Sequence, residues 1–217
     1  MEIYLKFYAQ VNQNTAIQLQ KIVEQGLLQG LQTLHLLIST PGGSVFDGIS
    51  LYNFLKGLPI TVNTYNFGSV DSIGVVVFCS GSNRYSVPNA RFLLHPVSMQ
   101  IVGNQVFDEP LLEERLNVMK ADQTNIARVI SFTINKPVDS VLKLIHNRTT
   151  FDPETALKNG LITEIKSGLV PAGAQLISIY DSQPQPPPIF QPYPNPRGIT
   201  VEPYQSFSII PNTFTKI

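Results

Sequence analysis

One stretch of sequence decides the expected fold: Leu34-His35-Leu36-Leu37-Ile38-Ser39-Thr40-Pro41-Gly42-Gly43-Ser44-Val45-Phe46-Asp47-Gly48. Residues 34–39 are almost wholly apolar and predict a buried strand. Pro41 and the two glycines break that strand, and residues 45–58 then carry apolar side chains at helical spacing. An apolar strand that leads directly into a helix indicates a mostly parallel sheet covered by helices, so the expected fold class is α/β.

Strand and helix patterns alternate on both sides of this stretch. Further strands are expected over residues 3–11, 60–65, 84–87, 91–94 and 161–165. Further helices are expected from Asn14, as the capping residue, and over residues 73–80, 110–135, 139–146 and those after Asp152. The helix over residues 110–135 is the longest, and it separates charged from apolar side chains.

The composition changes near residue 182. Nine of the seventeen prolines lie in residues 182–217, where a regular hydrogen-bond ladder cannot form because proline lacks the backbone N–H. We therefore expect an α/β domain over residues 1–181 and a proline-rich, extended C-terminal tail over residues 182–217.

The formal charge of the chain is zero, because fifteen Lys and Arg residues balance fifteen Asp and Glu residues. A nucleic-acid-binding protein or a protein held on anionic lipid would carry an excess of basic residues, so neither partner is expected. Only 14% of the residues are charged, against roughly 25% in an average soluble protein, which favours self-association.

The compartment is indicated by what the sequence lacks. The single cysteine, Cys79, lies in an apolar run and has no partner for an internal disulfide, which fits a reducing, cytoplasmic compartment. The longest apolar stretch, residues 73–79, is far shorter than the roughly 20 residues of a membrane-spanning helix. No export signal is expected, because the N-terminus has neither a basic region nor an apolar one.

Two strand-to-helix junctions carry the residues that could do chemistry. Pro41-Gly42-Gly43 is either a tight turn or part of an oxyanion hole, because paired glycines let backbone N–H groups approach a carbonyl oxygen closely. The second junction is Gly68-Ser69-Val70-Asp71-Ser72-Ile73-Gly74. Its polar side chains Ser69, Asp71 and Ser72 all qualify as a helix N-cap, and a serine at such a turn could also be an exposed nucleophile.

The chain has three histidines. His95 follows a strand and precedes Pro96, so its ring is expected at the sheet edge, where it could act as a general base. His35 lies within a buried strand pattern and is expected to be structural, while His146 ends a helix. No set of His and carboxylate residues has the spacing of a metal site, so no metal is expected.

Three segments resemble, in order and spacing, the Clp protease proteolytic subunits and the related phage head-maturation proteases. They are residues 39–52 with Pro41-Gly42-Gly43, the nucleophile turn 68–74, and the histidine strand Asn89-Ala90-Arg91-Phe92-Leu93-Leu94-His95-Pro96. The helix from Pro110 and the closing residues 151–162 also resemble the family, so the resemblance covers roughly residues 1–166. It implies a Clp/crotonase-like fold with ββα-type repeats and a projecting long helix.

The resemblance also implies a function, that of a serine endopeptidase that hydrolyses peptide bonds inside an oligomeric chamber. Ser72 is then the nucleophile, His95 the general base, and the amides of Gly43 and Ile73 the oxyanion hole. The implied partners are unfolded polypeptide or peptide substrates, an AAA+ ATPase, and other copies of the chain in a homo-oligomeric ring. No cofactor is implied.

Two departures from the family pattern bear on this activity. Asp71 stands directly before Ser72, where its carboxylate could repel an oxyanion or point outward as a cap. The family's third triad member, an aspartate, aligns with Arg148, which cannot accept the imidazole N–H. Asn147 offers a carbonyl beside that position, and Asp152 is the second candidate, although its place before Pro153 favours a helix cap.

These departures predict weak activity and leave two other functions open. Arg148 and Asp71 favour a catalytically weak or silent family member that acts as a ring scaffold or partner subunit. An acyl-CoA enzyme of the related crotonase fold would share the oxyanion architecture but would not need both Ser72 and His95.

Overall fold

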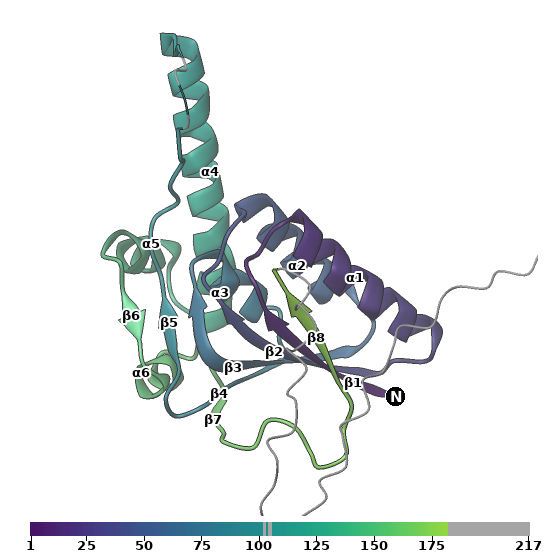
Figure 1. Cartoon of the computed structure of the whole chain (residues 1–217). Helices are drawn as coiled ribbons and strands as arrows, with labels where there is room; N and C mark the ends of the chain where they lie inside the picture. The colour runs from purple at the N-terminus through teal and green to yellow at the C-terminus, as the bar shows by residue number, and fades with distance from the viewer. Residues whose placement is uncertain (102, 104–105, 182–217) are drawn as a thin grey trace, which may run out of the picture. The chain divides into compact units, whose positions relative to one another are not determined.

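A computed structural model describes residues 1–101, 103 and 106–181, so the tail expected over residues 182–217 lies outside the described residues. The described chain is built on an eight-stranded sheet in which six strands follow the order β6-β5-β3-β2-β1-β8, while β4 pairs with β3 and β7 (Figure 1). Only β5 and β6 pair antiparallel, and every other described pair is parallel. The expected α/β class with a mostly parallel sheet is confirmed.

The elements follow one another in the alternation that the sequence predicts. The strands are β1 (Glu2–Tyr8), β2 (Thr33–Thr40), β3 (Thr61–Asp71), β4 (Asn83–Ser86), β5 (Arg91–Leu93), β6 (Thr150–Phe151), β7 (Glu164–Ile165) and β8 (Leu176–Tyr180). The helices are α1 (Gln13–Leu28), α2 (Val45–Gly57), α3 (Ile73–Phe78), α4 (Glu109–Ile134), α5 (Val138–His146) and α6 (Pro153–Lys158).

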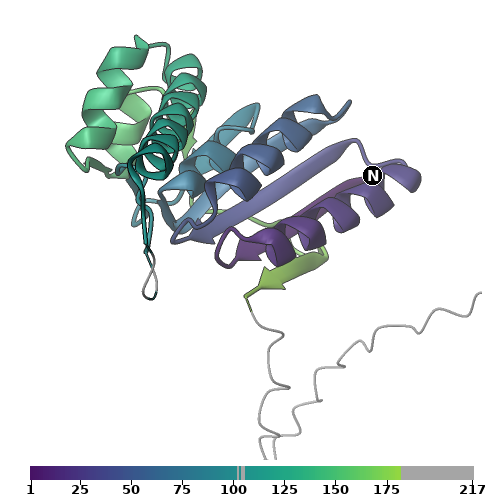
Figure 2. The ribbon, with the colours of Figure 1, turned by 90° about the horizontal axis from the view of Figure 1, so that it is seen from above.

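The main hydrophobic core lies between the helices and one face of the sheet. Leu5 and Leu36 are register partners on β1 and β2, and both are fully buried. Leu19 of α1 and Leu51 of α2 are also fully buried in this core, and each such side chain contributes about 1.5–3 kcal/mol. Figure 2 shows α1 and α2 side by side over the strands, with α4 and α5 grouped at the other end.

The opposite face of the sheet carries a smaller aromatic cluster, formed by Tyr4, Leu37 and Tyr65. His35 joins it, because its ring stacks on Tyr4 with a centroid distance of 4.2 Å and its Nδ1 lies 2.8 Å from the Tyr65 hydroxyl. Burial lowers the pKa of His35, although the nearby Glu2 acts in the other direction. His35 therefore packs as a structural residue on the sheet, as its strand pattern predicts, and lies away from the other histidines.

Several elements differ from the sequence-based expectations. The third strand was expected to end at Tyr65, but β3 continues to Asp71 because its second half pairs with β5, from Ser69 to Asp71. Helix α1 is capped by Asn12, which exchanges side-chain and backbone hydrogen bonds with Thr15 in a capping box, and not by Asn14. Strands β6 and β8 were not expected; β6 pairs antiparallel with β5, and β8 pairs in parallel with β1 at the sheet edge.

Helix α4 projects from the body (Figure 1). It begins at the cap residue Asp108, whose carboxylate accepts the Leu111 N–H, and Pro110 occupies its first turn. Its C-terminal half packs into the core through Ile126 and Ile130, while its N-terminal half leaves apolar side chains half exposed. No helix in the described part of the chain is long and apolar enough to span a membrane.

Candidate active site

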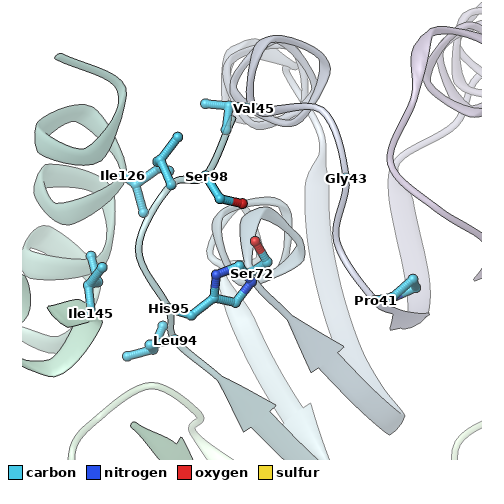
Figure 3. Close-up of a pocket in the computed structure, with 10 residues that line it drawn as sticks. Pro41, Gly43, Val45, Ser72, Leu94, His95, Ser98, Ile126 and Ile145 are labelled. Carbon is cyan, nitrogen blue, oxygen red and sulfur yellow. The ribbon is translucent and has the colours of Figure 1, made fainter. Parts of the chain in front are cut away.

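A cavity of about 170 Å³ lies where β2 and β3 end and where the chain leaves β5. It brings together three of the predicted site residues, Gly43, Ser72 and His95 (Figure 3). The remaining lining residues are Pro41, Val45, Leu94, Val97, Ser98, Ile126 and Ile145. Because the carboxyl ends of parallel strands meet at one sheet edge, residues that are tens of positions apart in the sequence share this cavity.

Ser72 joins β3 to α3 in a strained backbone conformation. Its φ of 57° and ψ of −129° lie outside the regions that a residue with a Cβ ordinarily adopts. Its N–H donates to the Leu93 carbonyl at 2.8 Å, which ties the turn to β5. Its side chain makes no capping hydrogen bond, so among the described residues the Ser72 hydroxyl is not used as an N-cap. This geometry leaves Oγ directed into the cavity (Figure 3).

Gly42 and Gly43 let the neighbouring backbone approach closely. A Cβ on Gly42 would lie 2.6 Å from Ser72 Cβ, and one on Gly43 would lie 2.1 Å from the Val11 carbonyl oxygen. Both glycines have positive φ, at 91° and 144°. The Val11 N–H donates to the Gly42 carbonyl and the Ser44 N–H donates to the Val11 carbonyl, which fixes the loop. Only glycine fits both positions without a clash.

Two backbone amides at the cavity have no acceptor within the described residues. The Gly43 N–H is not part of the bridge to Val11, because that bridge uses the Gly42 carbonyl and the Ser44 N–H. The Ile73 N–H is the first of α3, and the first amides of a helix have no carbonyl of their own helix to bind. Gly43 itself lines the cavity, and Ile73 directly follows the lining residue Ser72, so the place of both amides fits the oxyanion hole predicted from the sequence.

His95 lies just beyond β5, and its ring lines the cavity together with Ser72. Its Nδ1 lies 2.8 Å from the carbonyl oxygen of Pro96. No hydrogen bond joins the His95 ring to the Ser72 hydroxyl in the described chain, and no described carboxylate pairs with the ring. Hydrogen bonds of this kind are often long in sites without substrate, so the geometry fits a general base that engages when a peptide binds.

Asp71 is turned away from the nucleophile. One of its carboxylate oxygens accepts the Ser69 hydroxyl at 2.7 Å, and the other pairs with Arg91 at 2.9 Å. Asp71 lines a different hollow, together with Ser69 and Arg91, from the cavity that Ser72 lines. Asp71 is therefore neither a helix cap nor a free charge beside the oxyanion, because Arg91 neutralises it.

We expect Arg91→Gln to lower kcat about 10-fold, because it leaves a mostly buried Asp71 carboxylate uncompensated near the site where the substrate carbonyl oxygen develops negative charge. The double variant Arg91→Gln/Asp71→Asn removes both charges and should return kcat to within a few-fold of the parent. Arg91→Lys, which keeps the charge, is the matched control. Hydrolysis of a fluorogenic peptide measures all three, and a double variant as slow as Arg91→Gln would contradict the electrostatic role.

The candidates for the third triad member lie outside the cavity lining. Asn147 is exposed and follows α5, where its N–H donates to the Lys143 carbonyl. Asp152 caps α6, and its carboxylate accepts the Thr155 N–H at 2.7 Å, which is the capping role favoured by the sequence. Hydrogen bonding with the Thr155 side chain, and then with the Thr155 N–H, lowers the pKa of Asp152. Arg148 has a positive φ of 51° and an exposed side chain.

Ser98 was not predicted as a site residue, yet it lines the cavity, and its hydroxyl points toward Ser72 (Figure 3). It lies three residues after His95 in a loop, where the sequence gives no signal for the direction of the side chain.

Ile126 of α4 and Ile145 of α5 close the cavity from the other side. Among the described residues, no group of three or more His, Cys, Asp or Glu side chains is placed to hold a metal ion.

The fold and the cavity together define a class, that of Clp/crotonase-like α/β proteins with the site at the carboxyl ends of parallel strands. Within that class the family is clear. A family model described as Clp protease matches residues 3–168, which is most of the chain, and the chain belongs to the Clp protease family.

Individual relatives are similar over part of their length. The chain is 26% identical over 136 residues to ATP-dependent Clp protease proteolytic subunit 1 of Chlamydia felis, covering 62% of this chain and 65% of that protein. It is 30% identical over 132 residues to proteolytic subunit 2 of Thermobifida fusca, covering 60% and 63%. The match thus spans slightly less than two thirds of these relatives.

A solved structure supports the fold. A point mutant of ClpP1 from Listeria monocytogenes superposes with a TM-score of 0.68 at 20% sequence identity, covering 77% of this chain and 91% of that one. At this identity the similarity shows the fold alone.

Proposed function

We propose that this protein is a serine endopeptidase of the Clp proteolytic subunit type. Ser72 Oγ attacks the scissile carbonyl, His95 takes the hydroxyl proton and returns it to the leaving amine, and the amides of Gly43 and Ile73 stabilise the oxyanion. The observation that carries this proposal is the convergence of Gly43, Ser72 and His95 on one cavity, with Ser72 in a strained strand-to-helix turn. Family membership supports the same reaction.

The cavity supports a substrate preference. Part of its wall is apolar, formed by Val45, Leu94, Val97, Ile126 and Ile145. A peptide with an apolar side chain next to the scissile bond would bury that side chain against these walls, while a charged one would lose its hydration without a partner. Peptides and unfolded polypeptides with apolar residues at the cleavage site are therefore the proposed substrates, delivered by an AAA+ ATPase as the family membership suggests.

The test is labelling by a serine-directed fluorophosphonate probe. We expect one labelled peptide, which contains Ser72, and no labelling of the Ser72→Ala variant. A chain that stays unlabelled in its assembled form, while a serine protease labels in the same buffer, would overturn the peptidase proposal and support the silent scaffold subunit. Retention on immobilised CoA in that case would support the acyl-CoA enzyme.

We further propose a ring-shaped homo-oligomer with α4 in the contact between subunits or rings. The N-terminal half of α4 exposes Leu112, Leu116 and Val118 at 49%, 50% and 50%, which is more apolar surface on one projecting helix than a lone subunit is expected to carry. The low share of charged residues points the same way.

Light scattering at micromolar concentration is expected to give a mass of several subunits. Leu112→Glu/Leu116→Glu should lower that mass, because buried carboxylates without partners oppose association. Glu113→Gln/Glu114→Gln, on the same helix turns, is the control and should leave the mass unchanged. A monomer mass for the parent chain would rule the proposal out.

A further inference from the structure

His95 has an acceptor for its Nδ1 proton that is part of the main chain. The Pro96 carbonyl oxygen lies 2.8 Å from Nδ1, within ordinary hydrogen-bond distance. A carbonyl can only accept, so this contact is a hydrogen bond only when Nδ1 carries the proton. A neutral imidazole with its proton on Nδ1 has a bare Nε2, which is the tautomer that a base acting on a serine hydroxyl needs.

The sequence around His95 holds this geometry in place. The ring of Pro96 fixes its own φ near −65° and disfavours helical backbone at His95, which limits how far the carbonyl can move relative to the His95 ring. Strand β5 fixes the other side, because the Leu94 N–H donates to the Thr149 carbonyl at 2.9 Å. The acceptor is therefore positioned before substrate arrives.

The structure also shows why no carboxylate takes this place. In the antiparallel pairing of β5 and β6, Phe92 pairs with Phe151 and Leu93 with Thr150. The hydrogen bond from Leu94 to Thr149 continues the same register by one pair, and this register predicts position 148 opposite His95, where the left-handed backbone of Arg148 ends the ladder. That position holds Arg148, whose side chain has no acceptor.

We infer that the Pro96 carbonyl is the group that positions His95 in this site, fixing its tautomer, and that the site lacks only the negative charge that would stabilise the imidazolium. This inference rests on the proposed function. It makes Pro96 a positioning residue that acts through His95. It explains how Ser72 can be activated here, and it predicts slow turnover, because a neutral acceptor fixes the tautomer but supplies no charge.

The tautomer can be measured without any activity. The full-length chain has three histidines, so ¹⁵N-histidine labelling gives three imidazole pairs, assigned with His95→Gln and His146→Gln. We expect the neutral His95 ring to carry its proton on Nδ1, whereas exposed histidines favour Nε2. His146, exposed at the end of α5, is the internal reference for the ordinary tautomer.

A neutral His95 protonated on Nε2 would overturn the inference. So would a change of its tautomer in Asn147→Ala or Asp152→Ala, because the orienting group would then be one of those side chains. If fluorophosphonate fails to label Ser72 while His95 shows the Nδ1 proton, the peptidase proposal fails and the assignment of the Pro96 carbonyl stands.

The missing charge has its own test. Arg148→Asp places a carboxylate opposite His95 and should raise kcat more than 10-fold. The upper limit of this gain is about 10⁴-fold, which is the loss in kcat when the triad aspartate of a serine protease is replaced by asparagine. Arg148→Ala is the control, and it removes the arginine without adding a charge. Equal kcat for the two variants would show that charge is not what this site lacks.

Discussion

Ser72→Ala and His95→Ala should each reduce peptide hydrolysis to background; the loss is about 10⁶-fold in kcat for a complete triad and about 10²-fold here, because a site without the triad carboxylate already turns over about 10⁴-fold more slowly. Without the Ser72 hydroxyl there is no atom to attack the carbonyl. Without the His95 imidazole the hydroxyl keeps its proton, and a neutral serine is a weak nucleophile. The two variants should therefore look alike, and a double variant should be no slower than either one.

The fold should survive both substitutions. Ser72 makes no side-chain capping hydrogen bond, and the His95 ring is only partly buried, so neither truncation opens a large cavity in the core. Melting temperature and light scattering check this, and a fluorogenic peptide measures the rate in preparations free of host protease. A near-normal rate in either variant would contradict the proposed role of that residue as nucleophile or general base.

Gly42→Ala should also remove most of the activity, for a different reason. Its new Cβ would lie 2.6 Å from Ser72 Cβ and 2.8 Å from the Asp71 carbonyl oxygen, so the nucleophile turn has to move. A displacement of about 1 Å at a reacting group can cost about 10²-fold in rate. We expect a loss of at least that size in kcat, because the displaced atoms include the nucleophile.

Gly30→Ala is the matched control for this effect. Gly30 also has a positive φ, 82°, but a Cβ there would meet nothing within 4 Å. Both substitutions carry the strain of a left-handed residue, about 1–2 kcal/mol, while only Gly42→Ala contacts Ser72. A loss of stability in both variants and a loss of rate in Gly42→Ala alone would fit the contact with the nucleophile. Equal rates would mean that the turn adjusts without moving Ser72.

Much of the fold was accessible from local sequence signals. Hydrophobic periodicity predicts the apolar strands and their helices. The glycines Gly42 and Gly43 interrupt that periodicity and predict the turn between them. Errors arose where long-range pairing outweighs local signals. Gly68 suggested a turn, but β3 continues through it because the hydrogen bonds to β5 stabilise the extended chain up to Asp71.

The candidate site was predicted only in part. Gly43, Ser72 and His95 follow strand ends in a predicted parallel sheet, and that placement is enough to bring them to one edge. Ser98 could not be predicted, because no periodicity determines where a loop side chain points. The candidates for the third triad member were chosen by their nearness in sequence to Arg148, whereas the acceptor 2.8 Å from His95 Nδ1 is a backbone atom, which residue identity does not reveal.

The sequence by itself determined the alternation of strands and helices from β1 to α5, the break in that pattern at Gly42 and Gly43, and the residue types able to attack and to accept a proton. These are properties of single residues and their near neighbours, and they are independent of how the chain packs. Only the tertiary structure decided that Asp71 pairs with Arg91, that Ile126 and Ile145 close the cavity, and that β8 pairs with β1. Each of these contacts joins segments distant in sequence, and which segments meet is set by the burial and hydrogen bonding of the whole sheet.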